Sequence, residues 1–183
     1  MTAYQLSTVG DDSTSRTRLE CAVQRAENLA VLGAKNVLEL CVGPSLQALE
    51  IAYGFQGISC TGNDIDVRWK EYYPGGNWVI GDAMKISWEG FDTVVFAPPL
   101  SVGCNGERDS ALMINDITPS YRMFIQRPFS GLRCMVLPAR SFSTNVDRRQ
   151  FFSLLNNLQD VEVVPLTAGK RRIRKYVDVY YKG

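Results

Sequence analysis

The sequence predicts a three-layer α/β fold, in which a mostly parallel seven-stranded sheet lies between helices and ends in a C-terminal antiparallel hairpin. Five short apolar segments alternate with helical or loop-like segments, which is typical of a parallel sheet covered on both faces. Two further apolar segments near the C-terminus flank a short turn and predict the hairpin. The 183 residues, 45% hydrophobic and 21% charged, fit one globular domain. We expect this domain at residues 13–183, after a loose lead-in at residues 1–12.

Helices are expected between the apolar segments. The first begins near Ser13 and runs to residue 33, with Thr17 and Glu20 at the spacing of a capping box. The second begins at Ser45, whose side chain can cap it, and closes at Gly54. Two more are expected at residues 120–127 and 147–158. The intervening residues 101–119 are expected to form a long loop, a length that favours a role as a lid or in acceptor recognition.

Each expected strand is a short apolar run that ends at a glycine, a proline or a polar residue. The seven runs lie at residues 36–42, 58–63, 78–80, 91–96, 134–137, 161–166 and 176–181. In such an open sheet, ligands bind beyond the carboxyl ends of the strands. This rule selects the segment 39–45, Asp64, Asp82 and the segment 97–100 as the candidate site.

Composition excludes several classes of protein. The chain has no histidine, which excludes catalytic schemes that need an imidazole and zinc sites with histidine ligands, and we expect no metal site. Its five cysteines are odd in number and form no C-x-x-C pair, which is typical of reduced thiols in an intracellular protein. No run of 18 apolar residues occurs, so we expect a cytoplasmic protein that does not span a membrane.

Each feature of the candidate site also has a simpler structural interpretation. Gly43 fits an ordinary turn between a strand and a helix, and Asp64 and Asp82 fit exposed carboxylates at strand ends. The two prolines at 98 and 99 fit a loop stop. Taken together, the order of these features and their position after strands favour one ligand site over four unrelated turns.

Three motifs resemble those of class I S-adenosylmethionine-dependent methyltransferases, which have a Rossmann-like fold. Glu39-Leu-Cys-Val-Gly43 resembles the first motif, an acidic residue followed by a glycine-rich turn. Thr61-Gly-Asn-Asp64-Ile65 resembles the second, and Gly81-Asp82-Ala83 the third. The resemblance covers the chain from Asn36 to its C-terminus. The sequence G-x-G-x-x-G of nicotinamide-binding Rossmann proteins is absent.

The resemblance implies that S-adenosylmethionine is the cofactor and assigns residues to its parts. Glu39 and the backbone from Cys41 to Ser45 would hold the methionine portion. Asp64 would accept hydrogen bonds from both ribose hydroxyls, as suits a carboxylate facing a diol. Asp82 would accept from the adenine amino group, with the Ala83 N–H near the ring. The implied cofactor-binding set is Glu39, Cys41, Gly43, Ser45, Asp64, Ile65, Asp82 and Ala83.

Two departures from the family pattern are visible in the sequence. Cys41 stands where many members carry the first glycine of the turn. The catalytic segment Ala97-Pro98-Pro99-Leu100 resembles the Asp/Asn/Ser-Pro-Pro-aromatic motif of methyltransferases that modify amino nitrogens. In those relatives the first side chain accepts a hydrogen bond from the target amino group, and the aromatic ring stacks on the base. Ala97 has no such acceptor and Leu100 has no ring, although the backbone carbonyls remain.

Charge is distributed unevenly along the chain. The net charge is +1, but residues 1–91 hold 7 basic and 11 acidic side chains, and residues 92–183 hold 13 and 8. The turn expected near the C-terminus carries Lys170, Arg171, Arg172, Arg174 and Lys175. This turn predicts either a phosphate-binding edge for RNA or a solvated hairpin tip.

The leading hypothesis is a methyltransferase with a nitrogen acceptor, RNA being slightly preferred over DNA or protein. The alternatives are a non-catalytic module with a methyltransferase fold that binds RNA or a protein partner, and a small-molecule methyltransferase.

Overall fold

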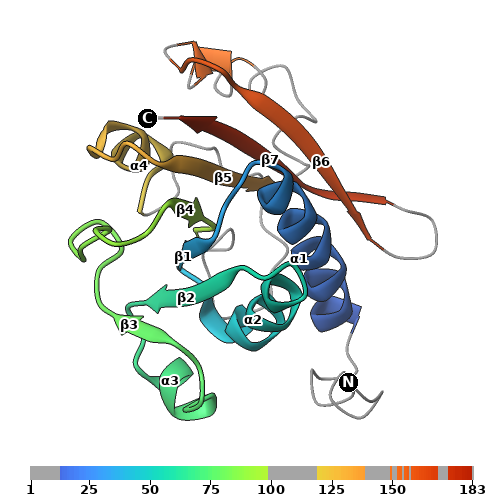
Figure 1. The fold of residues 1–183 in the computed structure, drawn as a ribbon, viewed down its shortest axis with the longest axis vertical. Helices are drawn as coiled ribbons and strands as arrows, with labels where there is room; N and C mark the ends of the chain where they lie inside the picture. Colours follow the sequence, from blue (N-terminus) through green and yellow to red (C-terminus); the bar gives the residue numbers. More distant parts are fainter. Residues whose placement is uncertain are drawn as a thin grey trace.

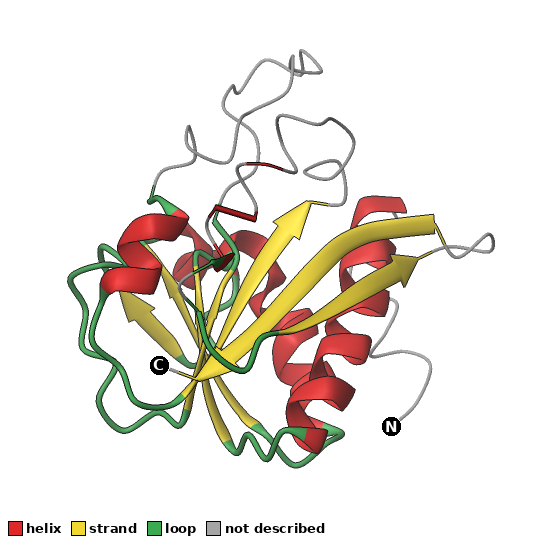
Figure 2. Cartoon of the chain, turned by 90° about the horizontal axis from the view of Figure 1, so that it is seen from above, coloured by secondary structure: helices red, strands yellow, loops and turns green. Residues whose placement is uncertain are grey.

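A computed structural model describes residues 13–98, 119–138, 149, 152–153, 155–156, 158–168 and 173–182, and confirms the expected α/β fold (Figure 1). One seven-stranded sheet has the order β3-β2-β1-β4-β5-β7-β6. Figure 2 shows the strands fanning out between helices on either side. The expected lead-in at residues 1–12 lies outside the described residues, as does the loop expected at residues 101–119 except for its last residue.

The first five strands are parallel and form the part of the sheet that carries the candidate site. They are β1 (Asn36–Leu40), β2 (Ser59–Asp64), β3 (Trp78–Ile80), β4 (Thr93–Phe96) and β5 (Leu132–Pro138). β1 pairs with β2 on one side and with β4 on the other, so Leu40 lies opposite both Asn63 and Phe96. The strand order therefore reverses beside β1, where a crevice opens at the carboxyl ends of the strands.

The C-terminal hairpin consists of β6 (Glu162–Ala168) and β7 (Ile173–Lys182). Its second strand lies between β5 and β6 and is antiparallel to both. The hairpin and its direction agree with expectation. The turn at residues 169–172, which holds Lys170, Arg171 and Arg172, lies outside the described residues, as do the side chains of Arg174 and Lys175.

Two apolar layers cover the two faces of the sheet, because successive strand residues point to opposite faces. On one face, α1 (Ser13–Val31) and α2 (Leu46–Gly54) pack side by side on β1, β2, β4 and β5 (Figure 1). On the other, α4 (Tyr121–Gln126) packs Tyr121 and Phe124 on the sheet together with Trp88. Alternation is visible within β1, where Val37 joins the first layer and Leu38 the second.

Several local expectations need correction. α1 begins at Ser13, so Thr17 lies inside the helix rather than at its start. Ser45 precedes α2, but its side chain makes no capping hydrogen bond, because the 3₁₀ turn η1 (Gly43–Ser45) already leads into the helix with helical dihedral angles.

The short helix α3 (Arg68–Tyr72) was not expected. Of the helix expected at 147–158, residues 149, 152–153, 155–156 and 158 are described: 149, 152–153 and 155 are helical, whereas 156 lies in a turn and 158 lies outside the helix. No described helix has the length and hydropathy of a membrane span.

Candidate functional site

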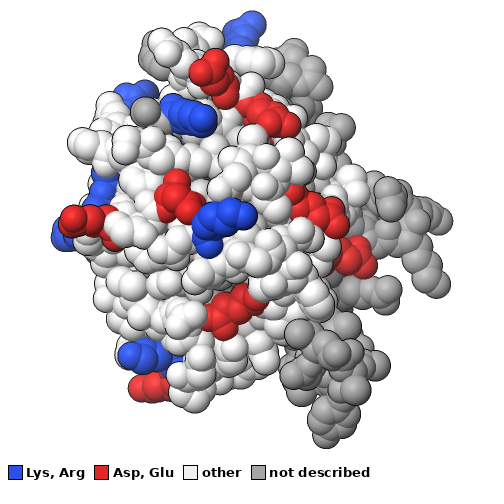
Figure 3. Space-filling model, viewed as in Figure 1, with Lys and Arg blue, Asp and Glu red and all other residues white. Residues whose placement is uncertain are grey.

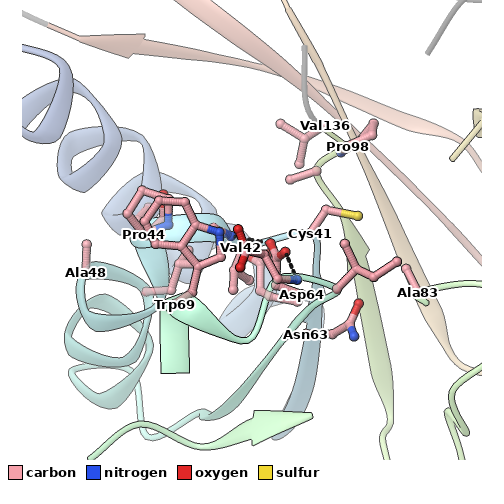
Figure 4. A pocket seen from close by; sticks show the side chains of 18 of the residues that line it. Cys41, Val42, Pro44, Ala48, Asn63, Asp64, Trp69, Ala83, Pro98 and Val136 are labelled. Carbon is pink, nitrogen blue, oxygen red and sulfur yellow. Dashed lines mark hydrogen bonds between the residues drawn. The ribbon is translucent and has the colours of Figure 1, made fainter. Parts of the chain in front are cut away.

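An open pocket of about 720 Å³ lies at the carboxyl ends of β1, β2 and β4 (Figure 4). Its lining brings together all eight residues of the expected cofactor set and the first two residues of the expected catalytic segment. These ten residues are Glu39, Cys41, Gly43, Ser45, Asp64, Ile65, Asp82, Ala83, Ala97 and Pro98. Pro99 and Leu100 lie outside the described residues. Segments up to 59 residues apart in sequence thus converge on one crevice, because parallel strands end at the same edge.

The turn after β1 forms part of the lining of this pocket. Cys41 has a φ of 61° and Gly43 a φ of 52°, so both lie in the left-handed region that favours glycine. The Gly43 N–H donates to Asp64 Oδ2 over 2.8 Å. A Cβ added at Gly43 would lie 3.9 Å from the Trp69 indole nitrogen, so the space above the turn is bounded by that ring. The turn keeps its backbone close to the pocket, as a ligand-binding turn requires.

Cys41 occupies a backbone conformation that favours glycine, the residue that stands at this position in the motif that the segment 39–43 resembles. A side chain in the left-handed region costs roughly 1–2 kcal/mol. Burial, and to a smaller extent the nearby Asp64 and Asp82 carboxylates, together raise the pKa of the Cys41 thiol to about 12. The thiol is therefore neutral at pH 7 and acts as a small apolar wall of the pocket.

We expect Cys41→Gly to raise the free energy of unfolding by about 0.5–1 kcal/mol, because relief of the left-handed strain exceeds the entropy lost by the more flexible glycine. Urea denaturation followed by circular dichroism measures this change. Cys41→Ala is the matched control, since it removes the thiol but keeps a Cβ in the strained conformation. A gain in the alanine variant equal to that in the glycine variant would contradict the explanation.

Asp64 ends β2 and is held by two backbone donors. Its Oδ2 accepts from Gly43, and its Oδ1 accepts from the N–H of Asp66 over 3.0 Å. Each carboxylate oxygen has a second lone pair, so both can accept one more hydrogen bond from the pocket side. Beside it, Ile65 is 74% exposed in the pocket mouth, which is unusual for a large apolar side chain at the end of a buried strand. Asp64 and Ile65 thus present a polar acceptor and an apolar surface to the same space.

Asp82 follows β3 and shapes the turn on the other side of the pocket. Its Oδ1 accepts from the Met84 N–H over 2.9 Å, and its Oδ2 lies 3.4 Å from Lys85 Nζ. The hydrogen bond from Met84, aided by Lys85, holds the pKa of this carboxyl below its usual range, so it is ionised at pH 7. Ala83 is buried against the second apolar layer. The pocket therefore has a fixed anionic acceptor on each side.

Glu39 lines the pocket and is fully buried. The Tyr53 hydroxyl of α2 donates to its Oε1, and Arg25 Nη1 of α1 lies 3.6 Å from the same oxygen. Its Oε2 has no hydrogen-bond partner among the described residues, although Glu39 lines the pocket. Burial raises the pKa of Glu39 against the opposing influence of Arg25 and Tyr53.

Several residues that line the pocket were not selected by the sequence reasoning, among them Trp69, Asn63 and Arg25. Trp69 of α3 is half-buried. In Figure 4, Trp69 and Pro44 lie on one side of the Asp64 carboxylate, and Cys41 and Pro98 lie on the other side. Asn63 is buried and donates to the carbonyl oxygens of Val79 and Gly81, both over 2.9 Å, which fixes the turn before Asp82. Arg25 comes from α1.

Their sequence signals differ in strength. An asparagine directly before Asp64, at the end of a buried strand, was a usable signal for the role of Asn63. Nothing in the local sequence distinguishes Trp69 or Arg25.

On the face of the molecule shown in Figure 3, the described Lys and Arg side chains are interspersed with Asp and Glu and form no single basic patch. The basic turn expected to meet RNA is not part of the described residues, so its surroundings remain a sequence expectation.

Solved structures of methyltransferases are similar to this chain. A putative RNA methyltransferase from Pyrococcus horikoshii superposes with a TM-score of 0.55 and 16% identity, over 98% of this chain and 96% of that one. The plantazolicin methyltransferase BpumL, solved with SAH, gives 0.58 and 12%, over 98% and 89%. The hMettl16 catalytic domain, solved with an RNA hairpin, gives 0.57 and 10%, over 91% and 70%. No protein-family model and no curated protein sequence matches the chain. These likenesses show a Rossmann-like methyltransferase fold.

Proposed function

We propose that the chain is an S-adenosylmethionine-dependent methyltransferase that acts on a nitrogen acceptor, with RNA slightly favoured over DNA or protein. One observation carries this proposal: Gly43, Asp64 and Asp82, at the ends of β1, β2 and β3, line a single pocket. The fold similarity to methyltransferases supports it. We also propose a cytoplasmic location, which the cysteine pattern supports, because the five cysteines are odd in number and form no C-x-x-C pair.

The residues of the pocket fit S-adenosylmethionine part by part. The left-handed turn at Gly43 leaves backbone open to the methionine portion. Asp64 has free acceptor capacity for both ribose hydroxyls. The exposed Ile65 offers an apolar surface to the adenine ring, and the ionised Asp82 can accept from the adenine amino group. The unpartnered Oε2 of the buried Glu39 suits the positive charge of the ligand.

The cofactor supplies the chemistry, a methyl group on a positively charged sulfur, so the chain has only to bind, orient and exclude water. In this proposal the backbone carbonyls of Ala97 and Pro98, at the pocket rim, accept hydrogen bonds from the target amino group. They orient its lone pair toward the methyl group. Accepting these hydrogen bonds and orienting the lone pair need no histidine, and the sequence contains none.

The direct test is transfer of tritium from S-[methyl-³H]adenosylmethionine to separate RNA, DNA and protein fractions of a cell extract. We expect label in the RNA fraction, at an amino nitrogen identified after digestion to nucleosides. Label in DNA or protein alone would contradict the RNA preference, and label on carbon or oxygen would contradict the nitrogen acceptor. Label that stays in the small molecules of the extract, outside these three fractions, would instead indicate a small-molecule methyltransferase.

A non-catalytic binding module is the second candidate, favoured by one observation. Ala97 lies at the pocket rim, where an acceptor side chain would act on the target, and it has no hydrogen-bonding group. This candidate expects S-adenosylmethionine to bind without transfer to any fraction. Ala97→Asn separates the two: a methyltransferase limited by this position gains transfer rate, whereas a binding module stays inactive.

A further inference from the structure

The floor of the pocket holds an excess of buried negative charge. Arg25 of α1 is 6% exposed, and Glu39 of β1 and Asp178 of β7 are fully buried. One cation therefore lies between two carboxyl groups, in a region where water cannot stabilise an unpaired charge. Both Arg25 and Glu39 line the pocket. A positively charged group that enters this part of the pocket would therefore lie next to this cluster.

The hydrogen bonds within the cluster are unequal. Arg25 Nε donates to Asp178 Oδ2 over 2.6 Å, and Nη2 donates to Oδ1 over 3.0 Å, so the guanidinium grips Asp178 with two donors. The Tyr180 hydroxyl donates to the same carboxylate over 3.1 Å. Glu39, by contrast, has Arg25 Nη1 only at 3.6 Å, beyond a hydrogen bond, and its Oε2 has no partner among the described residues. Asp178 is thus matched to the cation, and Glu39 is the carboxyl group in excess.

The remaining titratable groups around Glu39 carry no compensating charge. From α2, β2, β5 and β7 the cluster is faced by Tyr53, Cys60, Cys134 and Tyr180. Burial raises the pKa of each of these hydroxyl and thiol groups, so all four are neutral at pH 7. Burial also raises the pKa of Glu39 itself, in the direction of a protonated carboxyl.

We propose that Glu39 carries a proton in the unliganded protein and loses it when a cationic ligand enters, so that the pocket selects the positively charged methyl donor over neutral nucleosides. This proposal rests on the proposed function, which supplies the ligand. S-adenosylmethionine carries a sulfonium, an ammonium and a carboxylate, and so has a net charge of +1. Its ammonium and sulfonium supply the second cation that the cluster lacks. The Glu39 O–H bond breaks, the carboxylate keeps the electron pair, and the proton passes to the buffer.

The sign of the pH effect follows from this exchange. Below the raised pKa of unliganded Glu39, ligand binding must expel a proton, which opposes binding. The affinity for S-adenosylmethionine therefore increases as the pH rises toward that pKa, by up to about tenfold per pH unit for one linked proton. Methylthioadenosine, a neutral nucleoside without the amino-acid tail, has no charge to exchange, and its affinity stays flat over the same range.

Isothermal titration calorimetry of the full chain in buffers of different ionisation enthalpy tests the proposal. We expect S-adenosylmethionine to release up to one proton per molecule bound, read from the slope of binding enthalpy against buffer ionisation enthalpy. Methylthioadenosine should give a slope near zero. Glu39→Gln should abolish the slope for S-adenosylmethionine and reduce its preference over methylthioadenosine by about tenfold, while the exposed and remote Glu89→Gln should change neither.

The outcomes separate this inference from the proposed function. If S-adenosylmethionine binds with a heat that does not depend on the buffer, the inference is wrong and the proposed function stands. If Glu39→Gln still releases a proton, another group is responsible and the inference is also wrong. If no nucleoside binds, both are wrong. A binding heat that does not depend on the buffer overturns the inference on the unaltered chain alone, so the inference can be contradicted even if the glutamine variant does not fold.

Discussion

Asp64→Ala should weaken S-adenosylmethionine binding by roughly 100-fold, because two hydrogen bonds from ribose hydroxyls to a carboxylate are lost together. The structure leaves this carboxylate one free lone pair on each oxygen and holds it in place from Gly43 and Asp66. Asp64→Asn keeps the shape and one acceptor oxygen, so its loss should be smaller, roughly tenfold. Titration calorimetry at fixed pH measures both values.

A loss of affinity has meaning only if the pocket itself remains folded. The Asp64 carboxylate also accepts the Gly43 N–H, so its removal loosens the turn. Thermal unfolding of each variant without ligand measures that contribution. Glu71→Gln, an exposed neighbour on α3 that does not line the pocket, is the matched control and should bind as the unaltered chain does. Unchanged affinity in Asp64→Ala would contradict the assignment of the nucleoside site.

The elements that the sequence predicts well are those whose signals are local. The five parallel strands are short apolar runs, and the turns at Gly43 and Gly81 end two of the segments that carry the site. The order of β5, β7 and β6 was not predictable in the same way, because a hairpin can dock on a sheet edge through either strand. α3 is only five residues long and has too little periodicity to distinguish it from a loop.

In the candidate site, too, the parts with local sequence signals were predictable and the parts that depend on distant contacts were not. Convergence of the three strand ends was predictable, because parallel strands place their carboxyl ends at one edge. The surroundings of Glu39 were not. Its neighbour Arg25 is paired with Asp178, 153 residues further along the chain, and no local pattern reports so distant a contact. Likewise the left-handed conformation of Cys41 was visible in the sequence only as a missing glycine.

The pairing of Arg25 also leads to the largest stability effect that we expect. Arg25→Met should lower the free energy of unfolding by about 3–5 kcal/mol, since it leaves the buried Asp178 carboxylate without the cation that pairs with it. Methionine keeps much of the length and apolar surface of the arginine stem, so lost packing contributes little. Guanidinium chloride denaturation monitored by circular dichroism measures the change. Arg68→Met is the contrasting variant: Arg68 pairs with Asp66 at the surface with its side chain 81% exposed, and its loss should cost less than about 1 kcal/mol.

A second substitution distinguishes charge from packing as the cause. In Arg25→Met combined with Asp178→Asn, the buried charge that lost its partner is also removed, so part of the stability should return. The asparagine can still accept from the Tyr180 hydroxyl that donates to Asp178. If the double variant is as unstable as the sum of the two single variants, the cluster acts through shape and packing alone. Partial recovery instead means that α1 is attached to β7 through compensation of charge, and that the floor of the pocket depends on contacts between the two ends of the chain.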